Sequence, residues 1–178
     1  MNDRPLQTSI TLDLEHCDPE LTQAHRELYP ERIPEAIPFS LTLHYPWVPA
    51  AEVTKADLER VRAYLAGRPP LEFELVRVTE FPGLVAYAEP APDEQLRATM
   101  RGLWALYPDL PPYGRPGFDP PPHATLTRYA NAENATFEQA KERVEPLLPV
   151  RCLVGEAILQ EEYEPDRMRV RDRFPFGG

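Results

Sequence analysis

The chain has 178 residues, enough for one domain whose core needs no disulfide or metal to hold it. Its 42% hydrophobic and 27% charged residues are typical of globular proteins, and no apolar run approaches the roughly 18–20 residues of a membrane span. Lys and Arg number 19 against 29 Asp and Glu, and this net charge of −10 argues against a protein that coats DNA or a membrane surface. Residues 1–5 carry no apolar signal region. We therefore expect a cytoplasmic protein with no membrane partner.

The cysteine and histidine spacings point away from structural metal sites. Cys17 and Cys152 are too few for a disulfide framework or a zinc ribbon, so we expect free thiols. His16, Cys17 and His25 match no ordinary zinc spacing. We expect no metal and no cofactor. The 23 prolines concentrate at 108–122, where restricted φ angles and few backbone donors predict a stiff, ordered loop.

Alternating apolar and polar residues predict three strands in the first half of the chain. They cover residues 8–14, 39–45 and 71–81. Two helices are predicted between them from N-terminal capping signals. The first opens at 18–20 and runs to about residue 28, and the second is capped by Thr54 and runs to about residue 65. This half therefore has the order β-α-β-α-β.

The second half repeats this order and adds a closing hairpin. The predicted strands cover residues 83–89, 123–129, 151–162 and 167–174. The predicted helices cover residues 92–106 and 136–148, the latter capped by Thr136. Because strand 8–14 corresponds to 84–89 and strand 39–45 to 123–129, we interpret the chain as an internal duplication. The prediction is a single domain, 1–178, of α/β (α+β) type, with pseudo-symmetric lobes at about 1–81 and 82–178.

Two short stretches at equivalent places carry the chemistry. Ser40-Leu41-Thr42-Leu43 in the first half corresponds to His123-Ala124-Thr125-Leu126 in the second. On a strand, residues i and i+2 point to one face about 6.6 Å apart, so His123 and Thr125 project side by side. An imidazole transfers protons near pH 7, and a hydroxyl binds a phosphate oxygen. Two such pairs facing each other across a groove would form a metal-free site for phosphoryl transfer.

The sequence resembles the 2H phosphoesterase superfamily, in its branch of 2′-5′ RNA ligase-like proteins and RNA 2′,3′-cyclic phosphodiesterases. The stretches that carry the resemblance are 41–49, 81–83, 111–114 and 122–127. The resemblance implies a bilobal fold with a central groove and one His-x-Thr/Ser motif in each half. It further implies that the partner is an RNA end or a small cyclic or linear nucleotide, with no obligatory protein partner. Ligation or hydrolysis, and the oligomeric state, stay open.

The first motif departs from the family pattern because position 40 is serine. Thr42, His123 and Thr125 carry over residue by residue as catalytic and phosphate-binding groups. Serine cannot act as a general acid or base near neutrality, so we expect an impaired enzyme. By the period-2 rule, His44 shares the face of Ser40 and Thr42 and lies about 6.6 Å from Thr42. It therefore has two interpretations, a catalytic group in a reversed Thr-x-His arrangement or a residue at the strand end that touches no substrate.

Four further residues are predicted to bind substrate. Tyr45 and Tyr113 line the groove and stack a base, Arg128 supplies local positive charge, and the Ser40 hydroxyl suits an acceptor-rich ligand. Three functions remain open. The favoured one is a phosphoesterase acting on 2′,3′-cyclic phosphate or 2′-5′ phosphodiester groups of RNA or small nucleotides. The others are a non-catalytic phosphate- or nucleotide-binding module and a scaffold that keeps only the fold.

Overall fold

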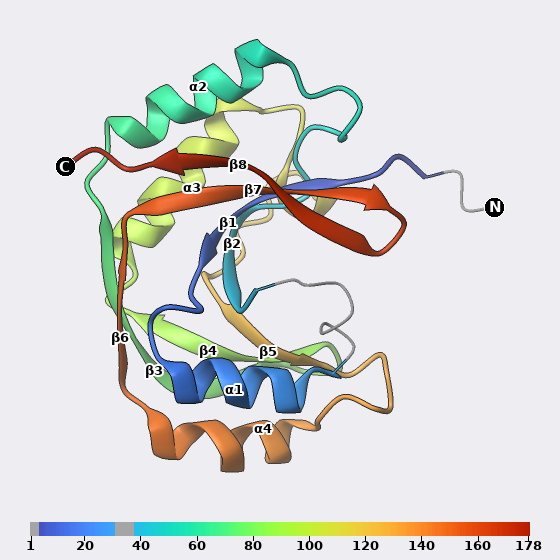
Figure 1. Ribbon diagram of the computed structural model, residues 1–178, viewed down its shortest axis with the longest axis vertical. Coiled ribbons are helices and arrows are strands. Elements are labelled where there is room, and N and C mark those ends of the chain that lie inside the picture. Colours follow the sequence, from blue (N-terminus) through green and yellow to red (C-terminus); the bar gives the residue numbers. More distant parts are fainter. Residues whose placement is uncertain (1–3, 31–37) are drawn as a thin grey trace.

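The computed structural model describes residues 4–30 and 38–178, which form four α-helices and one curled sheet of eight strands (Figure 1). The strands are β1 (Thr8–Asp13), β2 (Ser40–His44), β3 (Leu71–Phe81), β4 (Val85–Ala91), β5 (Ala124–Arg128), β6 (Val150–Val154), β7 (Glu156–Glu164) and β8 (Arg167–Pro175). The helices are α1 (Pro19–Leu28), α2 (Lys55–Ala66), α3 (Glu94–Leu106) and α4 (Phe137–Val144). The predicted mixed α/β fold is thus confirmed.

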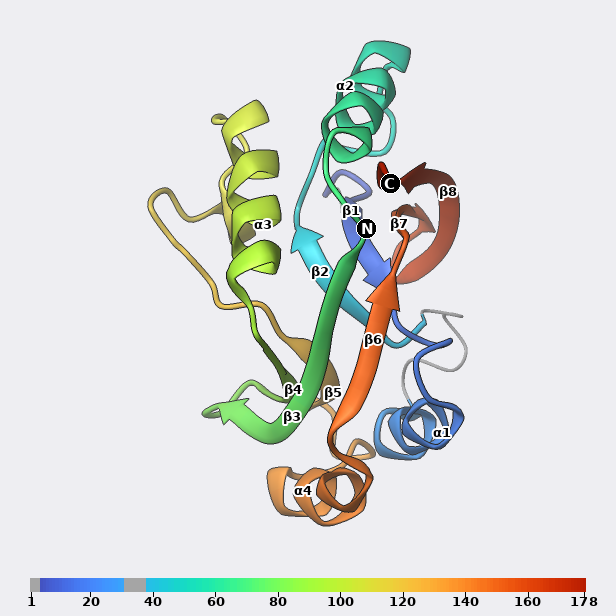
Figure 2. The same ribbon diagram turned by 90° about the vertical axis from the view of Figure 1, so that its left-hand side faces the viewer.

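The sheet has the order β6-β3-β4-β5-β2-β1-β7-β8, and its neighbouring strands run antiparallel. Figures 1 and 2 show two halves that meet where β2 lies beside β5. Helices α2 and α3 pack on β8 and β2, while α1 and α4 pack on the half that contains β5. Each half therefore has its own helical cover, and the pairing of β2 with β5 joins the halves.

Helices α1, α2 and α4 begin where the capping signals predict, whereas α3 begins at Glu94, two residues after the predicted start at residue 92. The Asp18 carboxylate accepts a hydrogen bond from the Leu21 backbone N–H at 2.8 Å. Thr54 and Thr136 each form a reciprocal capping box with the side chain three residues later. These contacts satisfy backbone N–H groups that have no partner inside the helix, which explains why these sequences start helices at these residues.

The predicted single strand at 151–162 is wrong in one respect, because it is two strands separated by Gly155. β6 pairs with β3, and β7 pairs with β1 in the other half of the sheet. The chain continues in an extended form from one half to the other (Figure 1). Alternation persists through this change of partner, so the sequence pattern alone could not reveal it. The lobe boundary expected near residue 81 falls between β3 and β4. These two strands are neighbours in the sheet, where β3 lies between β4 and β6.

The two strands that carry the motifs have matching irregularities in their pairing. Between β1 and β2 the register shifts so that β2 has one extra residue, Leu43. Between β4 and β5 the register shifts in the same way, and the extra residue is Leu126. Leu43 and Leu126 are at equivalent positions of the two motifs. Each central strand therefore carries a β-bulge one residue after its motif threonine, and such bulges re-aim the side chains that follow them.

None of the helices in 4–30 and 38–178 is long and apolar enough to cross a membrane.

Candidate functional site

The two motifs meet at the junction of β2 and β5. Leu41 pairs with Ala124, and both side chains are fully buried. Continued by one residue in each direction, this antiparallel register places Ser40 opposite Thr125 and Thr42 opposite His123, which directly precedes β5. These four side chains are half-buried and point to the other side of the sheet. We call this set, Ser40, Thr42, His123 and Thr125, the junction face.

The hydroxyl groups of the junction face are available for a ligand. In the described part of the chain, no hydrogen bond occupies the side chains of Ser40, Thr42 or Thr125. Directly opposite residues on neighbouring strands have Cβ atoms about 4.5–5.5 Å apart. Three hydroxyls and one imidazole therefore lie on neighbouring strands at the separation that opposite side chains usually have.

Aromatic rings hold the imidazole of His123. Its ring centroid lies 5.1 Å from that of Phe81 and 5.5 Å from that of Tyr87, both in edge arrangements. Tyr87 reaches this position because it pairs with Thr125 across the β4–β5 ladder. Neither Tyr87 nor Phe81 was predicted from the sequence, because their approach to His123 depends on the pairing of β4 with β5 and with β3.

His123 presents one nitrogen to the site as a free base. Its Nδ1 lies 2.8 Å from the Pro121 carbonyl, which can only accept a hydrogen bond, so Nδ1 carries the proton of the neutral ring. The Nε2 atom is then unprotonated. Burial lowers the pKa of His123 below its ordinary value, and the hydrogen bond to Pro121 opposes this effect. Near pH 7 the ring is therefore mainly neutral.

The proline loop places Tyr113 over His123. The Tyr113 backbone N–H donates to the Tyr45 carbonyl at 2.7 Å, which ties the loop to the end of β2. The two tyrosine rings are 6.0 Å apart, and their exposed fractions of 38% and 39% leave both accessible. The Tyr113 hydroxyl lies 3.5 Å from His123 Nε2. The structure thus brings Tyr45, Tyr113 and His123 together from distant parts of the sequence.

The expectation that His44 shares a face with Ser40 and Thr42 is wrong. Because of the bulge at Leu43, His44 pairs with Ile10 whereas Thr42 pairs with Thr11, and adjacent residues of β1 point to opposite faces. The His44 side chain is 1% exposed. Its Nε2 donates to the Leu110 carbonyl at 2.7 Å, in the loop after α3. His44 therefore anchors this loop on the side of the sheet away from the junction face.

The second half of the chain contains a counterpart of His44. Thr127 follows the bulge at Leu126 and is also fully buried. Its hydroxyl donates to the Ala135 carbonyl at 2.9 Å, in the loop that leads to α4. The two residues occupy equivalent positions and make equivalent contacts to a loop carbonyl. This parallel supports a structural role for His44.

We expect the burial of neutral His44 to make stability depend on pH. Burial lowers its pKa below 6.5, whereas an unfolded histidine titrates near 6.5. The unfolded state therefore binds more protons below that pH, and the free energy of unfolding falls as the pH drops. His44→Gln keeps a donor for Leu110 but removes the titration, so its stability falls less between pH 8 and pH 5. Thermal unfolding at several pH values measures this.

The control for this measurement is His16→Gln, because the ring of His16 is exposed. It should retain the pH dependence of the wild-type protein. An undiminished pH dependence in His44→Gln contradicts the assignment of His44 as a buried neutral ring.

Charged side chains border the junction face on two sides. Arg128 ends β5 in an exposed position, and no carboxylate of the described chain forms an ion pair with it.

Asp13 pairs with Ser40 across the β1–β2 ladder, and its carboxylate accepts from the Glu15 backbone N–H at 3.0 Å. The sequence analysis missed Asp13, although the alternation of β1 places it on one face with Thr11. Thr11 pairs with Thr42, and its buried hydroxyl has no partner in the described chain.

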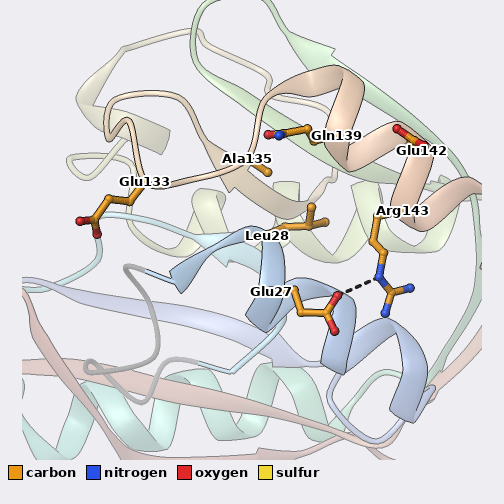
Figure 3. Close-up of a pocket in the computed structure, with 7 residues that line it drawn as sticks. All are labelled: Glu27, Leu28, Glu133, Ala135, Gln139, Glu142 and Arg143. Atoms are coloured by element: carbon orange, nitrogen blue, oxygen red, sulfur yellow. Dashed lines mark hydrogen bonds and ion pairs between the residues drawn. The ribbon is translucent and has the colours of Figure 1, made fainter.

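A separate hollow lies between α1 and α4 (Figure 3). Its lining includes Glu27 and Arg143, which form an ion pair at 2.8 Å, and two further glutamates, Glu133 and Glu142. None of the predicted site residues lines it. Within the described residues, no group of three or more His, Cys, Asp or Glu side chains is placed to hold a metal ion.

Solved structures share this fold. E. coli LigT complexed with NADP+ matches 99% of this chain and 100% of its own, with 14% sequence identity and a TM-score of 0.57. The complex of E. coli LigT with 3′-AMP matches 98% and 100%, at 15% identity and a TM-score of 0.54. The protein TT0787 of Thermus thermophilus matches 97% and 98%, at 19% identity and a TM-score of 0.61. At these identities the likeness shows the fold alone.

The sequence itself supplies the family. No curated protein matches the chain. Residues 10–165, well over half of the chain, match the sequence profile of the 2′-5′ RNA ligase superfamily. This stretch contains both motifs and the bulged strands that bring them together. The resemblance to 2H phosphoesterases is therefore confirmed, and the chain belongs to the 2′-5′ RNA ligase superfamily.

Proposed function

We propose that the protein is a 2H-type phosphoesterase acting on 2′,3′-cyclic phosphate or 2′-5′ phosphodiester groups of RNA or small nucleotides. The observation that carries this proposal is the pairing of Leu41 with Ala124, which puts His123 opposite Thr42 on the junction face. Its activity is lowered because Ser40 occupies the place where the family has its first histidine. We expect it to act in the cytoplasm and without a cofactor.

The proposed chemistry uses His123 as the general base. Its Nε2 is unprotonated in the neutral ring and takes a proton from the attacking water. The hydroxyls of Thr42 and Thr125 donate hydrogen bonds to the phosphoryl oxygens. The leaving ribose oxygen takes its proton from solvent water, because Ser40 cannot supply one near neutrality. Loss of one proton-transfer group typically lowers the rate by about 10²–10⁴.

Ligands of the structural neighbours support a nucleotide as the partner. E. coli LigT was crystallised with phosphate, 3′-AMP, ATP and NADP+. In this chain, the exposed ring of Tyr45 borders the junction face and offers a surface on which a base stacks. The unpaired Arg128 adds positive charge to an otherwise acidic protein.

A second candidate is a module that binds a phosphate or nucleotide without turnover. It is favoured by the position of His44, which leaves His123 as the one imidazole among the described residues at the junction face. Both candidates require the same phosphate site, and they differ in whether a bound cyclic phosphate is hydrolysed.

Titration with a nucleoside 3′-monophosphate, followed by the NMR signals of His123, tests the shared phosphate site. We expect the His123 signals to shift at millimolar ligand or below. Unchanged signals at saturating ligand contradict both candidates. Incubation with a 2′,3′-cyclic nucleotide, followed by ³¹P NMR, then separates them, because the enzyme yields a monophosphate and the binding module does not.

We expect phosphate affinity to fall as the pH rises. Burial lowers the pKa of His123 in the free protein, so a bound anion must pull a proton onto the ring to gain full charge pairing. The bound state therefore has the higher pKa, and binding weakens between the free and bound pKa values as protons become scarce. Calorimetric titration of inorganic sulfate, a phosphate analogue whose own charge stays constant over this range, at pH 5.5, 6.5 and 7.5 measures this. An affinity that is constant over this range contradicts contact with His123.

A further inference from the structure

The Tyr113 hydroxyl has an unusual position for a residue in an exposed loop. Tyr113 adopts a left-handed backbone conformation, with φ of 54°, which is uncommon for a bulky residue. Such conformations are found chiefly where the surrounding structure enforces them, and they cluster at functional sites. Here the hydrogen bond from Tyr113 N–H to the Tyr45 carbonyl, at 2.7 Å, holds the residue in place.

This backbone position directs the phenol toward His123 rather than into the core. The hydroxyl lies 3.5 Å from Nε2, at the outer limit of a hydrogen bond, and it has no other partner in the described chain. At this distance the hydroxyl and Nε2 form at most a weak hydrogen bond with each other, so both keep hydrogen-bonding capacity for a ligand. A phosphoryl oxygen to one side of the line that joins these two atoms would accept from the hydroxyl, and from Nε2 once that nitrogen has taken a proton, at the usual 2.5–2.9 Å of charge-assisted bonds.

The phenol remains a donor over the whole physiological range. Partial burial of the residue, together with the neighbouring Tyr45, raises the pKa of Tyr113 to about 12. A protonated phenol next to a phosphate anion costs no charge repulsion and adds one hydrogen bond. Among the described groups around His123, the Tyr113 hydroxyl is the side-chain donor that lies within reach of Nε2.

We propose that the Tyr113 hydroxyl binds the phosphoryl group of the substrate, together with His123 and the threonines of the junction face. This inference rests on the proposed function, because it assigns a further ligand to the same phosphate. It differs from the expectation that Tyr113 only stacks a base. The two roles are separable, since stacking requires the ring and a nucleobase, whereas the inferred contact requires the hydroxyl and a phosphate.

Tyr113→Phe separates these roles because it removes the hydroxyl and keeps the ring. The probe is inorganic phosphate, which has no base to stack. Hydrogen bonds to charged groups are strong enough that we expect phosphate affinity to fall roughly tenfold, and the affinity of a nucleoside 3′-monophosphate to fall by the same factor. Binding is followed by calorimetry and by the NMR signals of His123.

The control is Tyr163→Phe, which removes the hydroxyl of an exposed tyrosine on β7. It should bind phosphate as the wild-type protein does. If wild-type protein binds phosphate and Tyr113→Phe binds it equally well, the inference about Tyr113 is overturned and the proposed function stands. If phosphate leaves the His123 signals of wild-type protein unchanged, the proposed phosphate site is overturned as well.

Discussion

Ser40→His raises the hydrolysis of a 2′,3′-cyclic nucleotide by roughly 10²-fold or more, because it restores a positioned proton-transfer group. The site around position 40 suits an acid. Ser40 pairs with Asp13, and an imidazole there faces a carboxylate that stabilises its protonated form. His123, whose pKa is lowered by burial, stays neutral and serves as the base. The introduced imidazole is then protonated and acts as the acid, while neutral His123 acts as the base.

The measurement compares kcat of wild-type protein and Ser40→His across pH. In the variant we expect a bell-shaped profile, whose rising limb reports the base and whose falling limb reports the acid. Ser40→Ala is the matched control and should not gain activity. His44→Gln, combined with Ser40→His, should leave the gain intact because His44 lies on the opposite face of the sheet. A gain that disappears with His44 contradicts the assignment.

His123→Gln has the largest expected loss. It removes the base and keeps a side chain of similar size, so we expect any turnover to fall by about 10²–10⁴. It should also cancel the gain from Ser40→His in the double variant, because an acid and a base in one reaction depend on each other. The pH dependence that His123 contributes to oxyanion binding should vanish in this variant, as measured with sulfate.

Initial rates with a 2′,3′-cyclic nucleotide, measured alongside the thermal unfolding temperature, separate a catalytic loss from unfolding. His16→Gln serves as the control, since His16 is exposed and lies outside the junction face. Retention of full activity in His123→Gln contradicts the role of His123, whatever the outcome at position 40.

Most secondary structure follows from local patterns in the sequence. The capping residues Asp18, Thr54 and Thr136 predict the helix starts because a side-chain oxygen satisfies nearby backbone N–H groups whatever the tertiary context. Alternation of apolar and polar residues predicts the central strands β2 and β5, because one face of each strand is buried and the other is not. The residues of the second motif, His123 and Thr125, stay together because their spacing suits a strand.

Features that depend on partners distant in sequence could not be predicted. The bulge at Leu43 arises from the register of β2 against β1, and it reverses the face of His44 although the local pattern alternates regularly. The split at Gly155 depends likewise on which strand each side of it meets. The contact of Tyr113 with His123 depends on the docking of the proline loop against Tyr45.

The central claim is that the junction of β2 and β5 binds a phosphate. A crystal structure with a nucleoside 3′-monophosphate tests it most directly. We predict the phosphorus atom at the junction face, with phosphoryl oxygens in hydrogen-bond contact with His123 Nε2 and with the hydroxyls of Thr42 and Thr125. A nucleotide bound elsewhere, such as in the hollow between α1 and α4, with the junction face empty at saturating ligand, contradicts it.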